Sequence, residues 1–232
     1  MFLHVSAKNP EKGDTFVIQC DGKRRVVDSF STNTSFDCGE AVNCHAAVEY
    51  LPQNTMMKLS GWIFFILKEI ITSILFFLVF DKGRWFENIS PFKIKKKVIF
   101  KPSSPETGQL SFEFKNSSFD VVKCQYIFPV LSIETNGVIL TQEVGYLPNI
   151  GGIRLGYIHY LFQILTPSAI LLALCIYAGV YAVLDMNTVL IILLALSSVV
   201  ILTFVIVMLV RGRKTRHEVE DLVYSQLRSI KK

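Results

Sequence analysis

The chain has 232 residues, of which 51% are hydrophobic and 19% are charged, and its mean hydropathy is +0.42. Soluble domains carry about 25% charged residues, because charge keeps a folded surface dispersed in water. The composition therefore excludes a disordered chain, a collagen and a disulfide scaffold, and it favours a membrane protein with a modest soluble portion over an ordinary cytosolic enzyme.

Residues 1–57 are rich in β-forming residues. Two such runs, at 16–20 and 25–30, flank Asp21-Gly22. An Asp-Gly pair between β-rich runs is typical of a type I′ hairpin, which needs positive φ at both central residues. We expect about four strands here, and a lone domain that small would bury too little surface to be stable.

Four zinc-ligand side chains also occur in this block, namely Cys20, Cys38, Cys44 and His45. Thiolates and an imidazole suit zinc, but Cys38 and Cys44 are spaced too far apart for a tight knuckle. Ordinary free or buried cysteines are the preferred interpretation, with zinc and a disulfide as alternatives. Cys44 and His45 are adjacent and would point to opposite faces of a strand, which argues against cysteine catalysis.

Residues 59–80 are long enough and apolar enough to cross a membrane, yet they carry a polar stripe. At 100° per residue, one arc of this helix holds Lys68, Glu69, Thr72 and Ser73. The helix could lie in the membrane plane with the stripe toward water, and this interpretation is preferred. It could instead span the membrane with the stripe toward a partner helix, or carry a functional Lys68/Glu69 pair inside the membrane.

Residues 81–101 hold seven lysines and arginines against two acids. Such a cluster beside a membrane helix attracts anionic lipid. The candidate headgroup ligands are Lys93, Lys95, Lys96 and Lys97. The alternative is a solvated basic loop.

Residues 95–160 are again β-rich. Leu110, Phe112 and Phe114 alternate with polar residues, which is the pattern of a half-buried strand. Strands are predicted at 121–133 and 138–147, joined by Asn136-Gly137 as a second hairpin, and Pro129 indicates an edge strand or a bulge. Seven or eight short strands are expected in all. Combined with residues 1–57, they predict one small, mostly antiparallel β-sandwich of ordinary size. The alternative is two separate small β modules on opposite sides of the membrane.

Residues 151–156 are glycine-rich and are interpreted as a flexible link into the membrane, not as a phosphate loop, because no Lys-Ser/Thr follows. Residues 161–210 contain a single charge, Asp185. Fifty residues exceed one span, so we expect two helices, 165–184 and 188–210, in a tight hairpin broken at 185–188. Pro167 is taken to mark the first helical turn.

Four cations follow the second helix, namely Arg211, Arg213, Lys214 and Arg216. Cations beside a span indicate the cytoplasmic side. The soluble part and the C-terminus are then cytoplasmic, Asp185 is outside, and Cys124 is reduced. Residues 211–232 show a helical apolar pattern that could extend the span, dock a partner or lie on the membrane.

The chain is thus predicted to be a membrane α+β protein. Its expected parts are the sandwich halves 1–57 and 95–160, an inserted helix and basic loop at 58–94, a hairpin at 161–210 and a basic tail at 211–232. The preferred function is a non-enzymatic accessory or assembly subunit of a membrane complex, without cofactors, whose partners are lipids and a membrane protein or a second copy. The alternatives are an anionic-lipid-binding module and an oligomeric transporter or channel subunit using Lys68 and Glu69.

Overall fold

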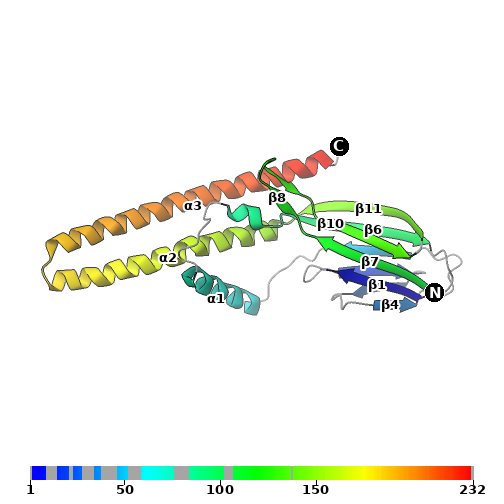
Figure 1. Ribbon diagram of the computed structural model, residues 1–232, viewed down its shortest axis with the longest axis horizontal. Coiled ribbons are helices and arrows are strands. Elements are labelled where there is room, and N and C mark those ends of the chain that lie inside the picture. Colours follow the sequence, from blue (N-terminus) through cyan, green and yellow to red (C-terminus); the bar gives the residue numbers. More distant parts are fainter. Residues whose placement is uncertain are drawn as a thin grey trace. The chain divides into compact units, whose positions relative to one another are not determined.

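The computed structural model describes residues 2–8, 15–20, 23–27, 34–37, 46–51, 59–75, 84–101, 107–136 and 138–230. The chain divides into two units. A sheet unit comprises Met1–Thr55, Ser90–Gly151 and Val223–Lys232, and a helical unit comprises Met56–Ile89 and Gly152–Leu222. Figure 1 labels several elements of each unit.

The described part of the sheet unit contains eleven strands. Their order in the chain is β1 (Phe2–Lys8), β2 (Thr15–Cys20), β3 (Lys23–Val27), β4 (Thr34–Asp37), β5 (Ala46–Leu51), β6 (Phe92–Lys101), β7 (Thr107–Lys115), β8 (Ser118–Asp120), β9 (Gln125–Ile127), β10 (Val130–Asn136) and β11 (Val138–Pro148). One sheet has the order β10-β7-β1-β4, a second has the order β11-β6-β5-β2-β3, and β8 pairs with β9. All pairs are antiparallel except β1 with β7, which is parallel.

Strands from the two β-rich blocks of the sequence share both sheets. β1 pairs with β7, with Val5 opposite Leu110, and β5 pairs with β6, with Val48 opposite Val98. Each sheet buries apolar residues, and those of the four-stranded sheet come from three of its strands. Its buried side chains are Leu3, Leu110, Phe112, Phe114 and Leu131. The alternating pattern at 110–114 therefore marks a real half-buried strand.

The two hairpins expected from the sequence have different outcomes. β2 and β3 pair antiparallel on either side of Asp21-Gly22, with Cys20 opposite Lys23, so that hairpin is confirmed. The Asn136-Gly137 hairpin is wrong, because β10 pairs with β7 and β11 pairs with β6. The chain changes sheets at this point instead of folding back on its own strand.

The strand expected at 121–133 is also interrupted. The Asp120 carboxylate accepts hydrogen bonds from the backbone N–H groups of Val122 and Lys123, at 3.0 and 3.1 Å. This local bonding stabilises a turn in place of an extended chain, and Cys124 closes the turn with φ of 49°. Pro129 lies directly before β10, which is an edge strand as the proline indicated.

The helical unit contains α1 (Leu59–Leu75), the short 3₁₀ helix η2 (Trp85–Asn88), α2 (Ile150–Leu184) and α3 (Thr188–Ile230). α2 and α3 run antiparallel and side by side (Figure 1), and they turn at Asp185–Asn187, where the sequence placed the break. Both helices are long enough and apolar enough to cross a membrane, by length and composition. Antiparallel sheets followed by two long apolar helices are thus confirmed.

The start of α2 differs from the expectation. The helix begins at Ile150, so residues 151–156 are helical and not a flexible link, and Pro167 lies inside the helix. A proline removes only one backbone hydrogen bond from a helix of 35 residues. The turns on both sides of Pro167 are otherwise continuous, so the helix persists through it.

The tail is helical, as its periodicity predicted, because α3 continues without interruption to Ile230. Within the sheet unit, Val223 is fully buried. The Gln226 side-chain amide accepts from the Tyr126 N–H at 3.3 Å and donates to the Tyr126 carbonyl at 3.1 Å. The last turns of α3 are therefore docked on strand β9.

Candidate functional site

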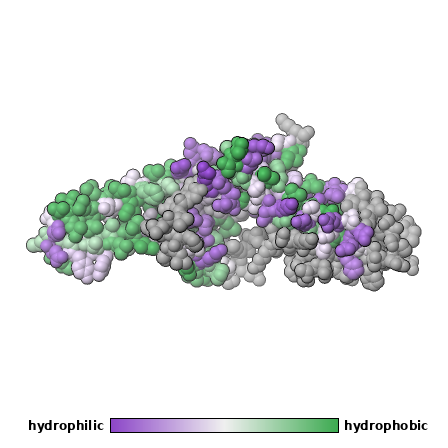
Figure 2. Space-filling view, in the orientation of Figure 1, coloured by the Kyte–Doolittle hydropathy of each residue, from purple (hydrophilic) through white to green (hydrophobic). Residues whose placement is uncertain are grey.

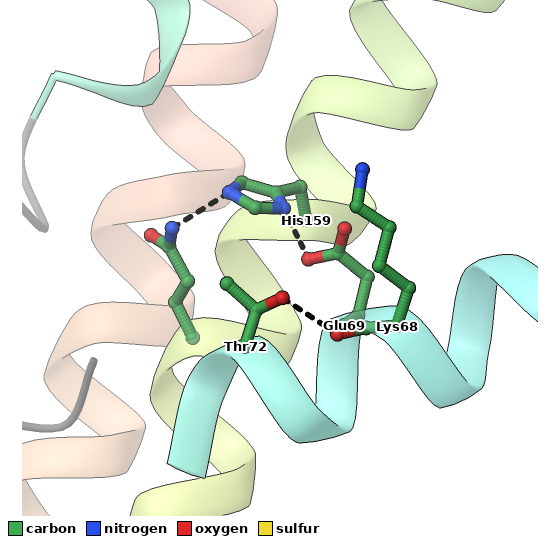
Figure 3. A network of polar contacts seen from close by, with 5 residues as sticks. Lys68, Glu69, Thr72 and His159 are labelled. Atoms are coloured by element: carbon green, nitrogen blue, oxygen red, sulfur yellow. Dashed lines mark hydrogen bonds and ion pairs between the residues drawn. The ribbon is translucent and has the colours of Figure 1, made fainter. Parts of the chain in front are cut away.

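A buried ion pair joins α1 to α2 inside the helical unit. Glu69 is only 4% exposed, and one of its carboxylate oxygens contacts Nδ1 of His159 (Figure 3). The other ring nitrogen of His159 lies 2.6 Å from Nε2 of Gln163, one turn further along α2. Burying a carboxylate costs free energy unless it is paired, so the contact with His159 reduces the cost of burying Glu69.

The four residues of the predicted polar stripe separate in the structure. Glu69 and Ser73 are buried, whereas Lys68 is exposed and lies on the other side of Glu69 from the ring (Figure 3). Thr72 donates its hydroxyl to the Lys68 carbonyl at 2.7 Å, which is a bond within the helix. Among the described residues, the ion-pair partner of Glu69 is His159 and not Lys68.

The face that α1 buries is the opposite of the preferred expectation, in which the stripe faced water. The stripe residues Glu69 and Ser73 face the interior, and the apolar residues on the other side are exposed, with Phe64 at 71%. The partner-helix interpretation placed the stripe against another helix, and one stripe residue, Glu69, contacts α2. Sequence reasoning missed His159 and Gln163, although a polar pair four residues apart at the start of an apolar run was an available signal.

A second constellation closes the base of the α2–α3 hairpin, and we name it the aromatic junction: Trp85, Gly156, Tyr157, Tyr160 and Gly212. Tyr160 is buried and donates its hydroxyl to the Met208 carbonyl of α3 at 2.9 Å. The ring centroids of Trp85 lie 5.9 and 6.1 Å from those of Tyr157 and Tyr160. The junction connects η2, α2 and α3.

The two glycines of the aromatic junction allow this close approach. A Cβ added at Gly212 would lie 2.3 Å from Cε1 of Tyr160, and one added at Gly156 would lie 2.3 Å from Cγ2 of Ile89. Both positions are helical, so it is space and not backbone conformation that requires glycine here. Trp85 is buried within this junction.

The four candidate headgroup lysines do not form one cluster. They lie on strand β6, where alternate side chains point to opposite faces. Lys95 is exposed and pairs with Glu49 at 2.9 Å, but Lys96 is buried and donates to the Leu131 carbonyl. Burial lowers the pKa of Lys96 below its usual value. Lys96 is therefore a structural residue, and only Lys93, Lys95 and Lys97 share the other face.

The zinc hypothesis is not tested by the structure. Cys38, Cys44 and His45 lie outside the described residues, and of Cys20 only the backbone of β2 is described. Within the described ranges, no three histidine, cysteine or acidic side chains gather closely enough to hold a metal ion. Cys124 and Cys175 are free thiols, and Cys124 is exposed.

Comparison with known proteins gives no match: no protein-family model fits the chain, and no curated protein and no solved structure is significantly similar to it.

Proposed function

We propose that the chain is an integral membrane protein whose α2–α3 hairpin crosses the bilayer twice. α2 and α3 measure about 52 and 64 Å at 1.5 Å per residue, which exceeds the hydrocarbon core of about 30 Å. In the most apolar stretch of α3, 0% of the residues are buried, and Figure 2 shows apolar side chains over much of the visible face of the hairpin. An apolar surface of this extent needs lipid or protein to cover it.

The sheet unit would lie on the cytoplasmic side and form a β-sandwich. The cations that follow the apolar part of α3 favour that side. Each sheet buries apolar side chains, and Lys96 of one sheet donates to a β10 carbonyl of the other, as two layers in face-to-face contact would allow.

Cysteine labelling tests this orientation. Met186, in the turn between α2 and α3, is replaced by cysteine, and Cys124 serves as the natural probe on the sheet unit. A membrane-impermeant maleimide should label Met186→Cys in intact cells, and it should reach Cys124 only after permeabilisation. Labelling of Cys124 in intact cells would place the sheet unit outside and contradict the proposal.

The function that the geometry supports best is that of a non-enzymatic accessory or assembly subunit of a membrane complex. The observation that carries this proposal is strand β11, which is an edge of the five-stranded sheet formed by the described strands. Val144 and Leu147 on this strand are both exposed. Exposed apolar edge strands recruit a further strand or an apolar surface from another chain, so β11 is the proposed docking edge.

A charge placed on this edge tests the proposal. The full chain, purified in mild detergent, is expected to retain a stoichiometric membrane-protein partner, and Val144→Lys should reduce that retention at least about tenfold, because burying an unpaired ammonium is costly. Gln125→Lys changes an exposed polar residue of β9, which belongs to another sheet, and should retain the partner. Light scattering that shows a monodisperse 26.3 kDa monomer for the wild-type chain would contradict the proposal.

A further inference from the structure

Helix α1 presents its apolar side outward. Phe64 is 71% exposed, and Ile63, Leu67 and Ile71 are exposed beside it, while Glu69 and Ser73 are buried. A helix on the surface of a soluble protein does the opposite and keeps its apolar stripe toward the core. The outward face of α1 therefore needs an apolar environment.

The pairing of β5 with β6 requires the chain to enter and leave α1 on the same side of a membrane. α1 follows β5 and precedes β6, and these two strands pair antiparallel over five residue pairs. Paired strands must lie in one compartment, so a single crossing by α1 would require a second crossing before β6. Residues 76–83 connect α1 to the described residues before η2, and eight residues reach at most about 29 Å even when fully extended. That is less than the hydrocarbon core of about 30 Å. The residues after 83 do not supply a return crossing, because Trp85 of η2 packs on Tyr157 and Tyr160, which precede the apolar run of α2. A crossing by α1 is therefore incompatible with the proposed hairpin.

The apolar face of α1 is continuous with the apolar surface of α2. A groove of about 520 Å³ is lined by Ile70 of α1 and by residues of α2 that include Leu161, Phe162 and Leu165. These α2 residues belong to the run that enters the proposed span. The same medium that covers the hairpin therefore has access to the outward face of α1.

We propose that α1 is embedded in the acyl chains of one leaflet, entering and leaving on the side of the sheet unit. Its occupant is a phospholipid monolayer, with the exposed Lys68 extending along its four-carbon stem to the headgroups. The Glu69–His159 pair holds α1 against α2 and hides the only carboxylate of the helix from the lipid. This inference rests on the proposed membrane hairpin and adds a third, non-crossing membrane element to it.

Depth-dependent fluorescence quenching tests the inference on the full chain in phosphatidylcholine vesicles. Trp62→Phe is the parent, and Trp85 is kept in every variant because it is buried. One tryptophan is then added at an exposed position, either Leu67 on α1, Val200 in the apolar part of α3, or Val122 in the turn after β8. Lipids carry bromine at shallow (6,7) or deep (11,12) acyl carbons, and the parent signal is subtracted.

Leu67→Trp should be quenched more strongly by the shallow bromines, Val200→Trp should be quenched by the deep ones, and Val122→Trp should not be quenched by either. If Leu67→Trp is unquenched while Val200→Trp is quenched, water, another chain or a second copy covers α1, and the inference is wrong although the hairpin stands. Stronger quenching of Leu67→Trp by the deep bromines would show a crossing helix and also overturn it. If Val200→Trp is unquenched, the hairpin is not in the membrane, and the proposed function and the inference fail together.

Discussion

Replacing His159 by leucine is expected to release α1 from α2. The substitution leaves the Glu69 carboxylate buried without its ion-pair partner, and breaking a buried pair in this way costs about 3 kcal/mol, the lower end of the usual range because the His159 side chain is 39% exposed. Amide hydrogen exchange in α1 should therefore become about 100-fold faster, because the open population rises by that factor. Exchange is measured by mass spectrometry in detergent micelles or vesicles.

The double variant separates an ion pair from simple packing. Glu69→Leu combined with His159→Leu removes both members of the pair, and replacing a buried pair by apolar residues is often neutral. The double variant should therefore recover most of the protection that His159→Leu loses. Lys68→Leu is the matched control, because Lys68 adjoins Glu69 but is exposed, and its effect should stay within about 0.5 kcal/mol. Equal exchange rates in His159→Leu and the wild type would show that the pair does not hold α1.

The second large effect is expected at Gly212. An alanine there would place its Cβ 2.3 Å from the ring of Tyr160, which is buried and fixed through its hydroxyl to Met208. Overpacking of this kind costs about 1–3 kcal/mol, which exceeds the gain of about 1 kcal/mol that alanine brings to a helix. Gly212→Ala should therefore lower the melting temperature in detergent.

Gly179 supplies the control for this prediction. It also lies in a long helix of the hairpin, but nothing approaches within 4 Å of an added Cβ. Gly179→Ala should thus be neutral or stabilise the protein by up to about 1 kcal/mol, through helix propensity alone. In a Tyr160→Ala background the clash is absent, and Gly212→Ala should no longer destabilise. A similar shift of the melting temperature for both glycine variants would show that contacts in the aromatic junction do not explain the effect of Gly212→Ala.

Local patterns predicted those elements whose formation depends on neighbours in the sequence. The turn at 185–187, the alternating strand at 110–114 and the Asp21-Gly22 hairpin were all visible, because periodicity and turn chemistry act over a few residues. The Asn136-Gly137 signal failed for the converse reason. Each flanking strand found a better partner far away in the sequence, and pairing of that kind leaves no local trace.

The candidate site shows the same division. The helical period predicts that Glu69 and Ser73 lie on one arc of the helix. It does not predict whether that arc faces the interior or the solvent, because this depends on the contact with His159, about 90 residues later. Likewise, the spacing of lysines in 93–97 predicted a basic cluster, and only the pleat of β6 and the Leu131 carbonyl show that Lys96 belongs to the interior.

The separation of Glu69 and His159 along the chain determines how long Glu69 exists without its partner during synthesis. At about 5–20 residues per second, a ribosome needs roughly 5–20 s to synthesise the about 90 residues that separate them. During that interval, Glu69 of the nascent helix has no His159 to contact. Strand β5 likewise cannot pair with β6 until the residues of β6 have been synthesised. Strands β1 and β5 consequently complete their pairing, with β7 and β6 respectively, only after residues 92–115 have been synthesised.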